Sequence, residues 1–253
     1  MTRRRRNLCV LAALAVAAGT VIAPFLLPRT EDSTGALRGR IVAWARQLYN
    51  ALLGRAPIPL KLPPRVYVCT PRAHPPGVRL RPARRSGPRP PFLGPIGVTN
   101  VALRKPVTGS GRDPIIGTVR NVTDGVKSPT EDATVELGPG VQWVQIDLLA
   151  PHRVYAVVVW HEPGRLNVYR DVVVQVADDP LFLRNVRTLF HNDHDNSAGL
   201  GIGKDWEYFE TNEGLLVDAR GARARLVRLY SNGCTSHDLN RYVEVEVFAL
   251  PVR

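Results

Sequence analysis

The chain has 253 residues and a formal net charge of +12, but residues 1–97 hold 17 of its 34 lysines and arginines and only two of its 22 acidic residues. Residues 98–253 are therefore slightly acidic and lack the basic face that neutralises phosphates, which argues against nucleic-acid binding by this part of the chain. A P-loop, a G-x-S-x-G sequence and an H-E-x-x-H sequence are also missing, so we expect no enzyme.

A charge-free apolar run, residues 8–27, follows four arginines at residues 3–6. A helix of about 20 residues spans the core of a bilayer, and the arginines favour the cytoplasmic side. Residues 1–32 are thus predicted to be a signal anchor or a cleaved signal peptide, and the length of the run favours the anchor. We expect the rest of the chain outside the cytoplasm, in the periplasm or at the cell surface, or secreted if the segment is cleaved.

Two further segments fill residues 33–97. The first, residues 34–54, repeats apolar residues at helical spacing, which predicts a basic amphipathic helix that lies on a membrane surface or packs on the folded region. The second, residues 57–95, contains 12 of the 22 prolines and several arginines. Because proline fixes φ and removes a hydrogen-bond donor, we expect a solvated cationic linker there, with an apolar island at residues 66–69 that can dock.

Apolar and polar residues alternate along short runs of residues 98–253, and Pro, Gly and Asn separate these runs. This pattern predicts β-strands with one face in a core and the other in solvent. The economical architecture is an all-β jelly-roll sandwich of about eight strands. The expected strands are residues 99–103, 133–137, 142–149, 153–160, 171–177, 206–210, 224–231 and 242–249.

Six phrases of this domain resemble those of discoidin domains, also called coagulation factor V/VIII type C domains, in the family's order. The phrases are TNVALRKPVT at 99–108, NVTDG at 121–125, WVQIDL at 143–148, VVVQVAD at 172–178, ARLVRLY at 224–230 and YVEVEVF at 242–248. That family belongs to the galactose-binding-like jelly rolls, with the family 32 carbohydrate-binding modules as relatives. The resemblance implies a non-catalytic module that binds carbohydrate or an envelope polymer. The alternative is a protein-interaction or structural module without a sugar ligand.

The resemblance also implies a structural Ca²⁺ ion. Members often hold one beneath the loop after the D-G turn, with ligands from an Asp, a loop Thr or Ser, backbone carbonyls and a Glu of the closing strand. Asp124 and Glu244 match this set, and Thr130 matches it approximately, because the loop at residues 126–131 departs from the family pattern. Hard oxygen ligands suit Ca²⁺. The alternative is that Asp124 only makes an Asx turn and that Glu244 faces water.

Polar loops between the predicted strands supply candidate ligand-binding residues, since a sugar needs His, Arg, Asn and Asp side chains for hydrogen bonding. The candidates are His161, Arg165, Asn192, Asp193, His194, Asp195, Asn196, His237 and Asn240. For residues 191–196 three alternatives stay open: a ligand loop, a transition-metal site, or a polar loop that caps its own backbone. The loops form one site only if the jelly roll brings these strand ends to the same edge.

Two cysteines, Cys69 and Cys234, lie outside the apolar segment. In an exported chain, an even number of cysteines favours a disulfide. Such a bond would fasten the apolar island of the linker to the loop at residues 231–240. Two free thiols are the alternative.

Overall fold

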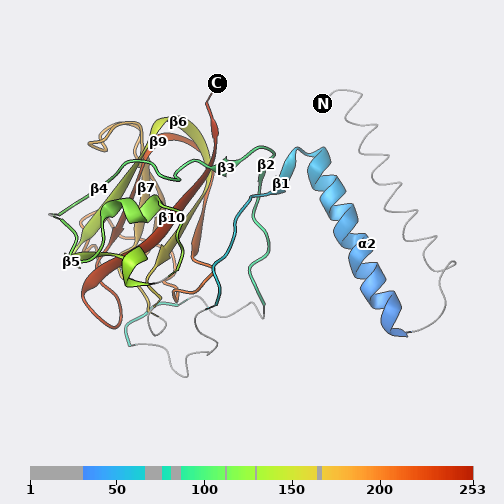
Figure 1. Cartoon of the computed structure of the whole chain (residues 1–253), viewed down its shortest axis with the longest axis horizontal. Helices are drawn as coiled ribbons and strands as arrows, with labels where there is room; N and C mark the ends of the chain where they lie inside the picture. The colour runs from blue at the N-terminus through green and yellow to red at the C-terminus, as the bar shows by residue number, and fades with distance from the viewer. Residues whose placement is uncertain are drawn as a thin grey trace. The chain divides into compact units, whose positions relative to one another are not determined.

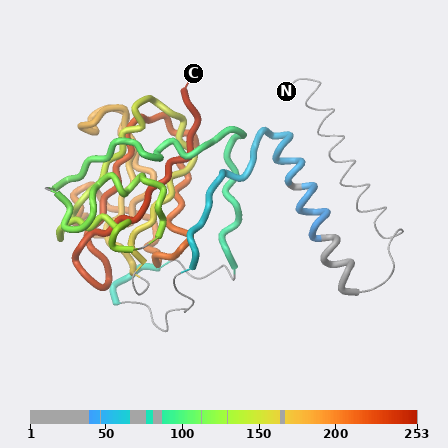
Figure 2. Tube along the Cα trace, viewed as in Figure 1, coloured from blue at the N-terminus to red at the C-terminus, as the bar shows by residue number. Residues whose placement is uncertain are grey.

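The computed structural model describes residues 31–65, 76–80, 87–111, 113–128, 130–163 and 167–252 (Figures 1 and 2). The chain divides into two compact units. The first comprises residues 1–57 and 93–96, and the second comprises residues 58–92 and 97–253.

The first unit contains the expected amphipathic helix and a short strand pair. Helix α2 spans Glu31–Leu52, and Gly54 follows it at a φ of 69°, the left-handed conformation that commonly ends a helix. Strands β1 (Arg55–Pro57) and β2 (Leu93–Pro95) pair antiparallel. Trp44, on α2, is 60% exposed.

Several predicted features lie outside the described residues. They are the apolar run at residues 8–27, the island at residues 66–69 with Cys69, and Arg165. Within the part of the chain that the structure describes, no helix is both long and apolar enough to cross a membrane.

The second unit is an all-β sandwich of antiparallel strands, which confirms the expected fold class. Its strands are β3 (Thr99–Asn100), β4 (Val107–Gly109), β5 (Val135–Pro139), β6 (Gln142–His161), β7 (Val173–Ala177), β8 (Arg187–His191), β9 (Leu215–Ser231) and β10 (Leu239–Pro251). Two 3-10 turns, η2 (Val119–Thr123) and η3 (Glu131–Ala133), precede β5. The strand expected at residues 206–210 is wrong: that segment is irregular, with one bridge at Glu207.

Strands β6 and β9 belong to both layers of the sandwich, and Figure 1 shows both as long curved ribbons. The first half of β6 pairs with β4 and with the second half of β9, whereas its second half pairs with β10 and with the first half of β9. The register shifts between Asp147 and His152, and Leu149 between them has a φ of 69°. This bulge lets two expected strands form one bent strand that turns from one layer into the other.

Alternate residues of β6 enter two different apolar clusters. Val157 and Val159 lie in the core between the layers, whereas Ala156, Val158 and Trp160 face outward against a second cluster. Both faces of this part of β6 are therefore buried, which accounts for its unbroken apolar run. The outer cluster is covered by Ile58, Leu60 and Phe92 of the proline-rich stretch.

We call the described residues 58–65, 76–80 and 87–92 the strap. Several hydrogen bonds join it to the sandwich. Arg89 donates to the carbonyls of Glu213 and Gly214, Lys127 donates to the carbonyl of Lys61, and Asn212 donates to the carbonyl of Pro63. The carboxylate of Glu207 accepts the amide of Arg79. These residues pack on the sandwich rather than forming the solvated linker that we expected. The reason is long-range: proline prevents the strap from forming a ladder of its own, but its carbonyls still accept hydrogen bonds from distant side chains.

Candidate functional site

Four loops meet at one end of the sandwich, which we call the loop end. They lie at residues 162–172, 191–203, 204–214 and 231–240. The amide of Glu210 donates to the carbonyl of Asn167 at 2.8 Å, and the hydroxyl of Ser236 donates to the Asn167 side chain at 2.7 Å. The amide of Asn192 donates to the carbonyl of Val172 at 3.1 Å. The structure thus brings together the three loops that carry the predicted ligand residues.

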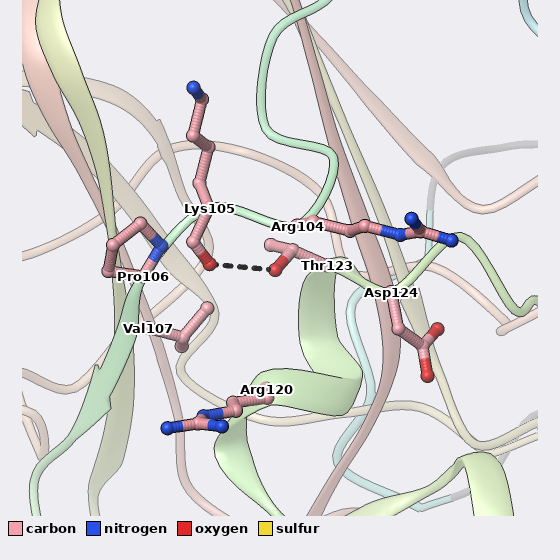
Figure 3. Close-up of a pocket in the computed structure, with 7 residues that line it drawn as sticks. All are labelled: Arg104, Lys105, Pro106, Val107, Arg120, Thr123 and Asp124. Atoms are coloured by element: carbon pink, nitrogen blue, oxygen red, sulfur yellow. Dashed lines mark hydrogen bonds between the residues drawn. The ribbon is translucent and has the colours of Figure 1, made fainter.

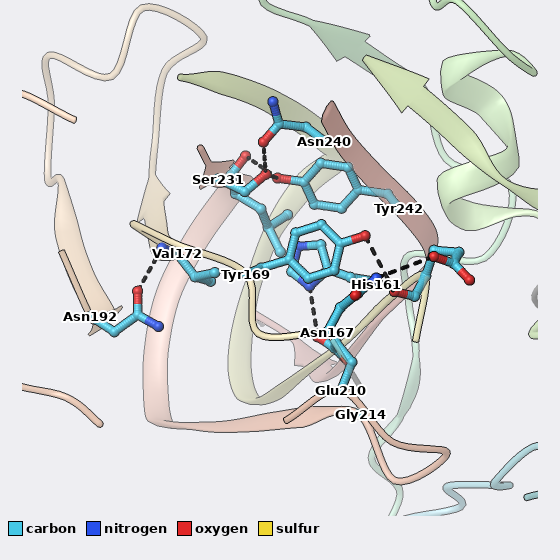
Figure 4. Close-up of polar contacts among 12 residues, drawn as sticks. His161, Asn167, Tyr169, Val172, Asn192, Glu210, Gly214, Ser231, Asn240 and Tyr242 are labelled. Atoms are coloured by element: carbon cyan, nitrogen blue, oxygen red, sulfur yellow. Dashed lines mark hydrogen bonds and ion pairs between the residues drawn. The ribbon is translucent and has the colours of Figure 1, made fainter. Parts of the chain in front are cut away.

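A buried polar cluster lies beneath the loop end (Figure 4). Nδ1 of His161, the last residue of β6, lies 2.8 Å from Oε1 of Glu210, and neither side chain is exposed. The His161 ring stacks on Tyr169 at 4.3 Å between centroids and contacts Tyr242 at 4.7 Å. Burial raises the pKa of Glu210, and the contact with His161 opposes this rise. Oε2 of Glu210 is buried without a hydrogen-bond partner. His161 was predicted to face a ligand, but it ties β6 to the 204–214 loop instead.

Three more predicted ligand residues, Asn192, Asp193 and Asn240, also point inward. Asn240 donates to two carbonyls of the β5–β6 turn, at residues 138 and 140. Asn192 accepts the amide of Val172 at 2.6 Å, and Asp193 accepts three amides of its own loop. All three residues are at most 1% exposed. Their role is the backbone capping that short Asn and Asp side chains provide in tight loops.

The other predicted ligand residues lie at or near the surface of the loop end. Asp195 and Asn196 are exposed, and His194 and His237 are half-buried. Nδ1 of His194 lies 3.3 Å from the carbonyl of Gly203. The expected transition-metal alternative used two histidines and two carboxylates of this loop.

The structure groups three carboxylates at the loop end instead of that mixed histidine and carboxylate set. Oxygens of Asp171, Asp193 and Asp195 lie within 4.8 Å of one another. Hydrogen bonds from the loop already occupy these acids: Ser197 and Asn232 donate to Asp171, and backbone amides donate to both Asp193 and Asp195. The cluster is thus accounted for by the loop's own bonding.

Trp206 is a surface residue of the loop end that was not among the candidate ligand residues predicted from the sequence. It was assigned to a strand, but it lies in the 204–214 loop and is 46% exposed. Its neighbour Asp205 pairs with the end of β8: the Asp205 carboxylate accepts the amide of His191 at 2.7 Å, and the Asp205 amide donates to the carbonyl of His191 at 3.0 Å. Residues 204–210 mix charged and aromatic side chains, and a short run of this kind looks alike in a strand and in a loop, so no local signal could have identified Trp206.

A second candidate site lies where the turn after η2 meets β10. We call it the acidic corner. Glu244 is fully buried, its Oε2 accepts the amide of Gly125 at 3.0 Å, and its Oε1 is buried without a hydrogen-bond partner. Burial raises the pKa of Glu244 to about 9, and the charges of Asp124 and Glu246 add to the rise. The alternative that Glu244 faces water is therefore wrong.

Asp124 supplies the second carboxylate of the acidic corner. Its Oδ1 accepts the amide of Val126 at 2.7 Å, which is the Asx turn considered above, and its charge also acts on Glu244. Thr130, the third predicted ligand, is exposed at the start of η3, and its carbonyl accepts the amides of Ala133 and Thr134. The donor set fits a hard cation, because a buried carboxylate oxygen without a partner lies next to a second acid.

A cleft of about 480 Å³ opens beside the acidic corner (Figure 3). Its lining residues are Arg104, Lys105, Pro106, Val107, Arg120, Thr123 and Asp124. Arg104 is held at a φ of 56°, and its amide donates to the carbonyl of Thr123 at 2.6 Å. The long cationic side chains leave the backbone in different directions in Figure 3, so they do not converge on one ligand position.

Cys234 is buried in the 231–240 loop, and its sulfur lies 3.3 Å from the hydroxyl of Ser236. Its proposed partner, Cys69, lies outside the described residues. The disulfide between them therefore stays a prediction.

Comparison with known proteins gives matches to solved structures alone. No protein-family model and no curated protein matches it. Among solved structures, the family 32 carbohydrate-binding module of AlyQ, in complex with 4,5-unsaturated mannuronic acid, is 20% identical with a TM-score of 0.43 and covers 56% of this chain and 93% of its own.

Two further modules have similar values. A Streptococcus pneumoniae fucose binding module is 20% identical with a TM-score of 0.42, and covers 60% of this chain and 96% of its own. Chitosan-binding module 1 from a chitosanase/glucanase of Paenibacillus sp. IK-5 is 19% identical with a TM-score of 0.40, and covers 58% and 97%. Identities and scores this low leave the ligand to be argued from the site itself.

Proposed function

We propose that this chain is a non-catalytic carbohydrate-binding module whose ligand lies on the loop end, against Trp206. The observation that carries the proposal is the half-exposed indole of Trp206 on a loop that buried hydrogen bonds hold in place. A sugar ring presents an apolar face that stacks on an aromatic ring, and its hydroxyls need polar partners at the edge. Asp195 and Asn196, which are exposed, offer such partners at the same end.

A preformed loop end favours binding because little conformational entropy is lost when the ligand arrives. The His161–Glu210 pair fixes the end of β6 against the 204–214 loop, and Asn240 fixes the 231–240 loop. Each hydrogen bond to a sugar replaces one to water and contributes only about 1 kcal/mol net. We therefore expect weak, reversible binding of a single sugar unit.

The absence of catalysis is part of the proposal. In the described part of the chain, the histidine that forms an ion pair with a carboxylate is His161, and its pair with Glu210 is closed to solvent. A general acid or base must come within hydrogen-bond reach of the substrate, and this pair has no exposed atom.

The test is a glycan-binding screen with the full-length chain, followed by Trp206→Ala on whichever sugar binds. We expect Trp206→Ala to lower the affinity about tenfold or more, since one aromatic stacking contact contributes about 0.5–1.5 kcal/mol beyond the area that it buries. The matched control is Trp44→Ala, which removes an exposed tryptophan from α2. Unchanged affinity in Trp206→Ala with an unchanged melting temperature contradicts the proposal.

We further propose that the acidic corner binds Ca²⁺ as a structural ion. Glu244 and Asp124 would hold it, and the buried Oε1 of Glu244 is the observation that supports this. When bound, the ion supplies positive charge to two carboxylates that otherwise repel each other. Thr130 belongs to this proposal only through the family resemblance.

The location of the module is also a proposal, and it rests on the sequence alone. Residues 8–27 would anchor the chain in a membrane with the sandwich outside the cytoplasm, where an envelope polymer could be the ligand and Cys69 could pair with Cys234. Protease added to intact spheroplasts should remove the sandwich, and protection until lysis contradicts the topology. Peptide mapping without reductant tests whether Cys69 and Cys234 form a disulfide.

Docking of a protein partner is the second candidate function. It is favoured by Leu181 and Leu183, which are 72% and 76% exposed at the tip between β7 and β8. Asp179 accepts the amides of Leu181, Leu183 and Arg184, so the tip has a fixed shape. Loss of a partner in Leu181→Ser/Leu183→Ser, with sugar binding absent in the unaltered chain, would favour this candidate.

A further inference from the structure

The strap reaches the loop end beside Trp206. Leu80 forms a parallel bridge with Glu207, and the Glu207 amide donates to the carbonyl of Arg79 at 3.2 Å. The carboxylate of Glu207 accepts the Arg79 amide in return. Glu207 is only 8% exposed, so this contact fixes the backbone of the strap against the 204–214 loop.

The register of this bridge places Arg79 and Trp206 on the same side. Paired residues of neighbouring extended segments point the same way, and successive residues alternate. Leu80 and Glu207 share the buried side, and the residues before them, Arg79 and Trp206, share the other. Their burial agrees, because Arg79 and Trp206 are exposed, whereas Leu80 is half-buried and Glu207 is buried.

Two cationic residues therefore lie near Trp206 along the backbone. Arg79 comes from the strap, and Lys204 lies two residues before Trp206 and is exposed. Neither side chain forms an ion pair with a carboxylate in the part of the chain that the structure describes. The nearest acid in sequence, Asp205, already accepts the amide of His191. A guanidinium beside an aromatic face suits a planar anion on a stacked ring, which it can bind with two parallel hydrogen bonds.

We infer that the strap completes the binding site, and that the ligand is an anionic saccharide whose carboxylate or sulfate is bound by Arg79. This inference rests on the proposed carbohydrate site at Trp206. It goes further in two respects: part of the site comes from outside the sandwich, and the charge of the ligand is specified.

The experiment compares three ligands of equal length on the full-length chain: an oligogalacturonate, a neutral galacto-oligosaccharide and its sulfated form. Isothermal titration is run for the unaltered chain, for Arg79→Gln and Arg79→Lys, and for Arg187→Gln. Arg187 is an exposed arginine at the end of β8 away from His191, so it serves as the matched control. Preference for the oligogalacturonate indicates a carboxylate, and preference for the sulfated sugar indicates a sulfate.

We expect the unaltered chain to prefer one acidic ligand to the neutral one. Arg79→Gln should lower the affinity for that ligand about tenfold, because a charge-assisted hydrogen bond is lost, and should leave the neutral affinity and the melting temperature unchanged. Arg79→Lys should lose less, and raising the salt concentration should reduce the preference. Arg187→Gln should match the unaltered chain.

Two results overturn the inference in distinguishable ways. If Trp206→Ala abolishes binding while Arg79→Gln leaves the affinity for every ligand unchanged, the site is correct but the strap is not part of it. If none of the three ligands binds the unaltered chain in this assay or in the wider glycan screen, the carbohydrate function itself fails, and this inference fails with it.

Discussion

Two glutamates are buried in the sandwich, Glu210 beneath the loop end and Glu244 in the acidic corner, and their carboxylates have different neighbours. Neither is exposed to solvent, and burial raises the pKa of both. Glu210 has a histidine at 2.8 Å and the Tyr208 hydroxyl nearby. Glu244 has one backbone amide, that of Gly125, and its charged neighbours are Asp124, Glu246 and Lys127. Lys127 forms its ion pair with Glu246.

The difference shows that burial alone does not mark a binding site. A carboxylate whose partners come from its own chain is part of the fold, and removing a partner damages the fold. Both glutamates have one carboxylate oxygen without a hydrogen-bond partner, so the difference lies in their neighbours. A buried carboxylate that no histidine contacts, and that has other acids beside it, needs a cation or a proton from outside. Glu210 belongs to the first kind and Glu244 to the second, so they should respond differently to mutation, to calcium and to pH.

The largest expected effect is from His161→Leu. This change leaves Glu210 buried without its ionic partner, and breaking a buried pair in this way costs about 3–5 kcal/mol. At about 2–4 °C per kcal/mol for a domain of this size, the melting temperature should fall by about 10 °C. The double variant His161→Leu/Glu210→Leu should recover most of this loss. A double variant that melts no higher than the single one would mean that the pair does not act as a unit.

Calcium should raise the melting temperature of the unaltered chain. A ligand that binds only the folded state stabilises it by about 2.7 kcal/mol at a hundredfold excess over its Kd. Differential scanning calorimetry with Ca²⁺ and with chelator measures this. Glu244→Gln should remove the response, whereas Asp132→Asn, an exposed acid on η3, should keep it. An equal melting temperature of the unaltered chain in both solutions would contradict calcium binding at the acidic corner.

The pH dependence of the metal-free chain is the next effect. The folded pKa of Glu244, about 9, lies above the ordinary value of 4.5, so between these values the folded state binds a proton that the unfolded state has released. Stability should therefore be full below about pH 4.5 and fall as the pH rises towards 9. We expect a loss of about 2 kcal/mol between pH 5 and pH 9 in chelator, because relaxation and water entry reduce the full effect of the shift.

Glu244→Gln tests the origin of this pH dependence. Glutamine cannot ionise, so the melting temperature of this variant should change less between pH 5 and pH 9 than that of the unaltered chain. Saturating Ca²⁺ should also flatten the curve of the unaltered chain. Parallel curves for the variant and the unaltered chain in chelator would assign the dependence to other groups.

The smallest effect is expected from Asp124→Asn. Asparagine keeps a side-chain oxygen for the Val126 amide, so the turn should survive. Removal of the negative charge next to Glu244 should leave the metal-free melting temperature at pH 8 equal or slightly higher, by about 2 °C or less. The calcium response should shrink. A drop of many degrees in chelator would show that Asp124 is needed for the fold rather than for a cation.

The sequence by itself determined much of the longer strands, because a strand is a local pattern, but it did not predict β4 or β8. Alternation at period two located β6, although as two strands, the second half of β9 and most of β10. The phrase NVTDG at 121–125 led to the acidic corner. The acidic corner could be predicted because the family resemblance links Asp124 to Glu244. The two segments are far apart in the sequence, since 119 positions separate Gly125 from Glu244. The same local pattern misplaced Trp206, since a short run of aromatic and charged residues has no feature that separates a strand from an exposed loop.

Only the tertiary structure decided which polar residues face solvent. His161 and Asn240 belong to residue types that form sugar sites, yet Glu210, 49 positions away, buries the first, and a turn about 100 positions away buries the second. Tertiary structure also turned the proline-rich stretch into a strap, because Ile58 and Phe92 cover apolar side chains that β6 presents on its outer face. Burial depends on which distant segments pack together, and the composition of a loop or a linker does not indicate which segment it packs against.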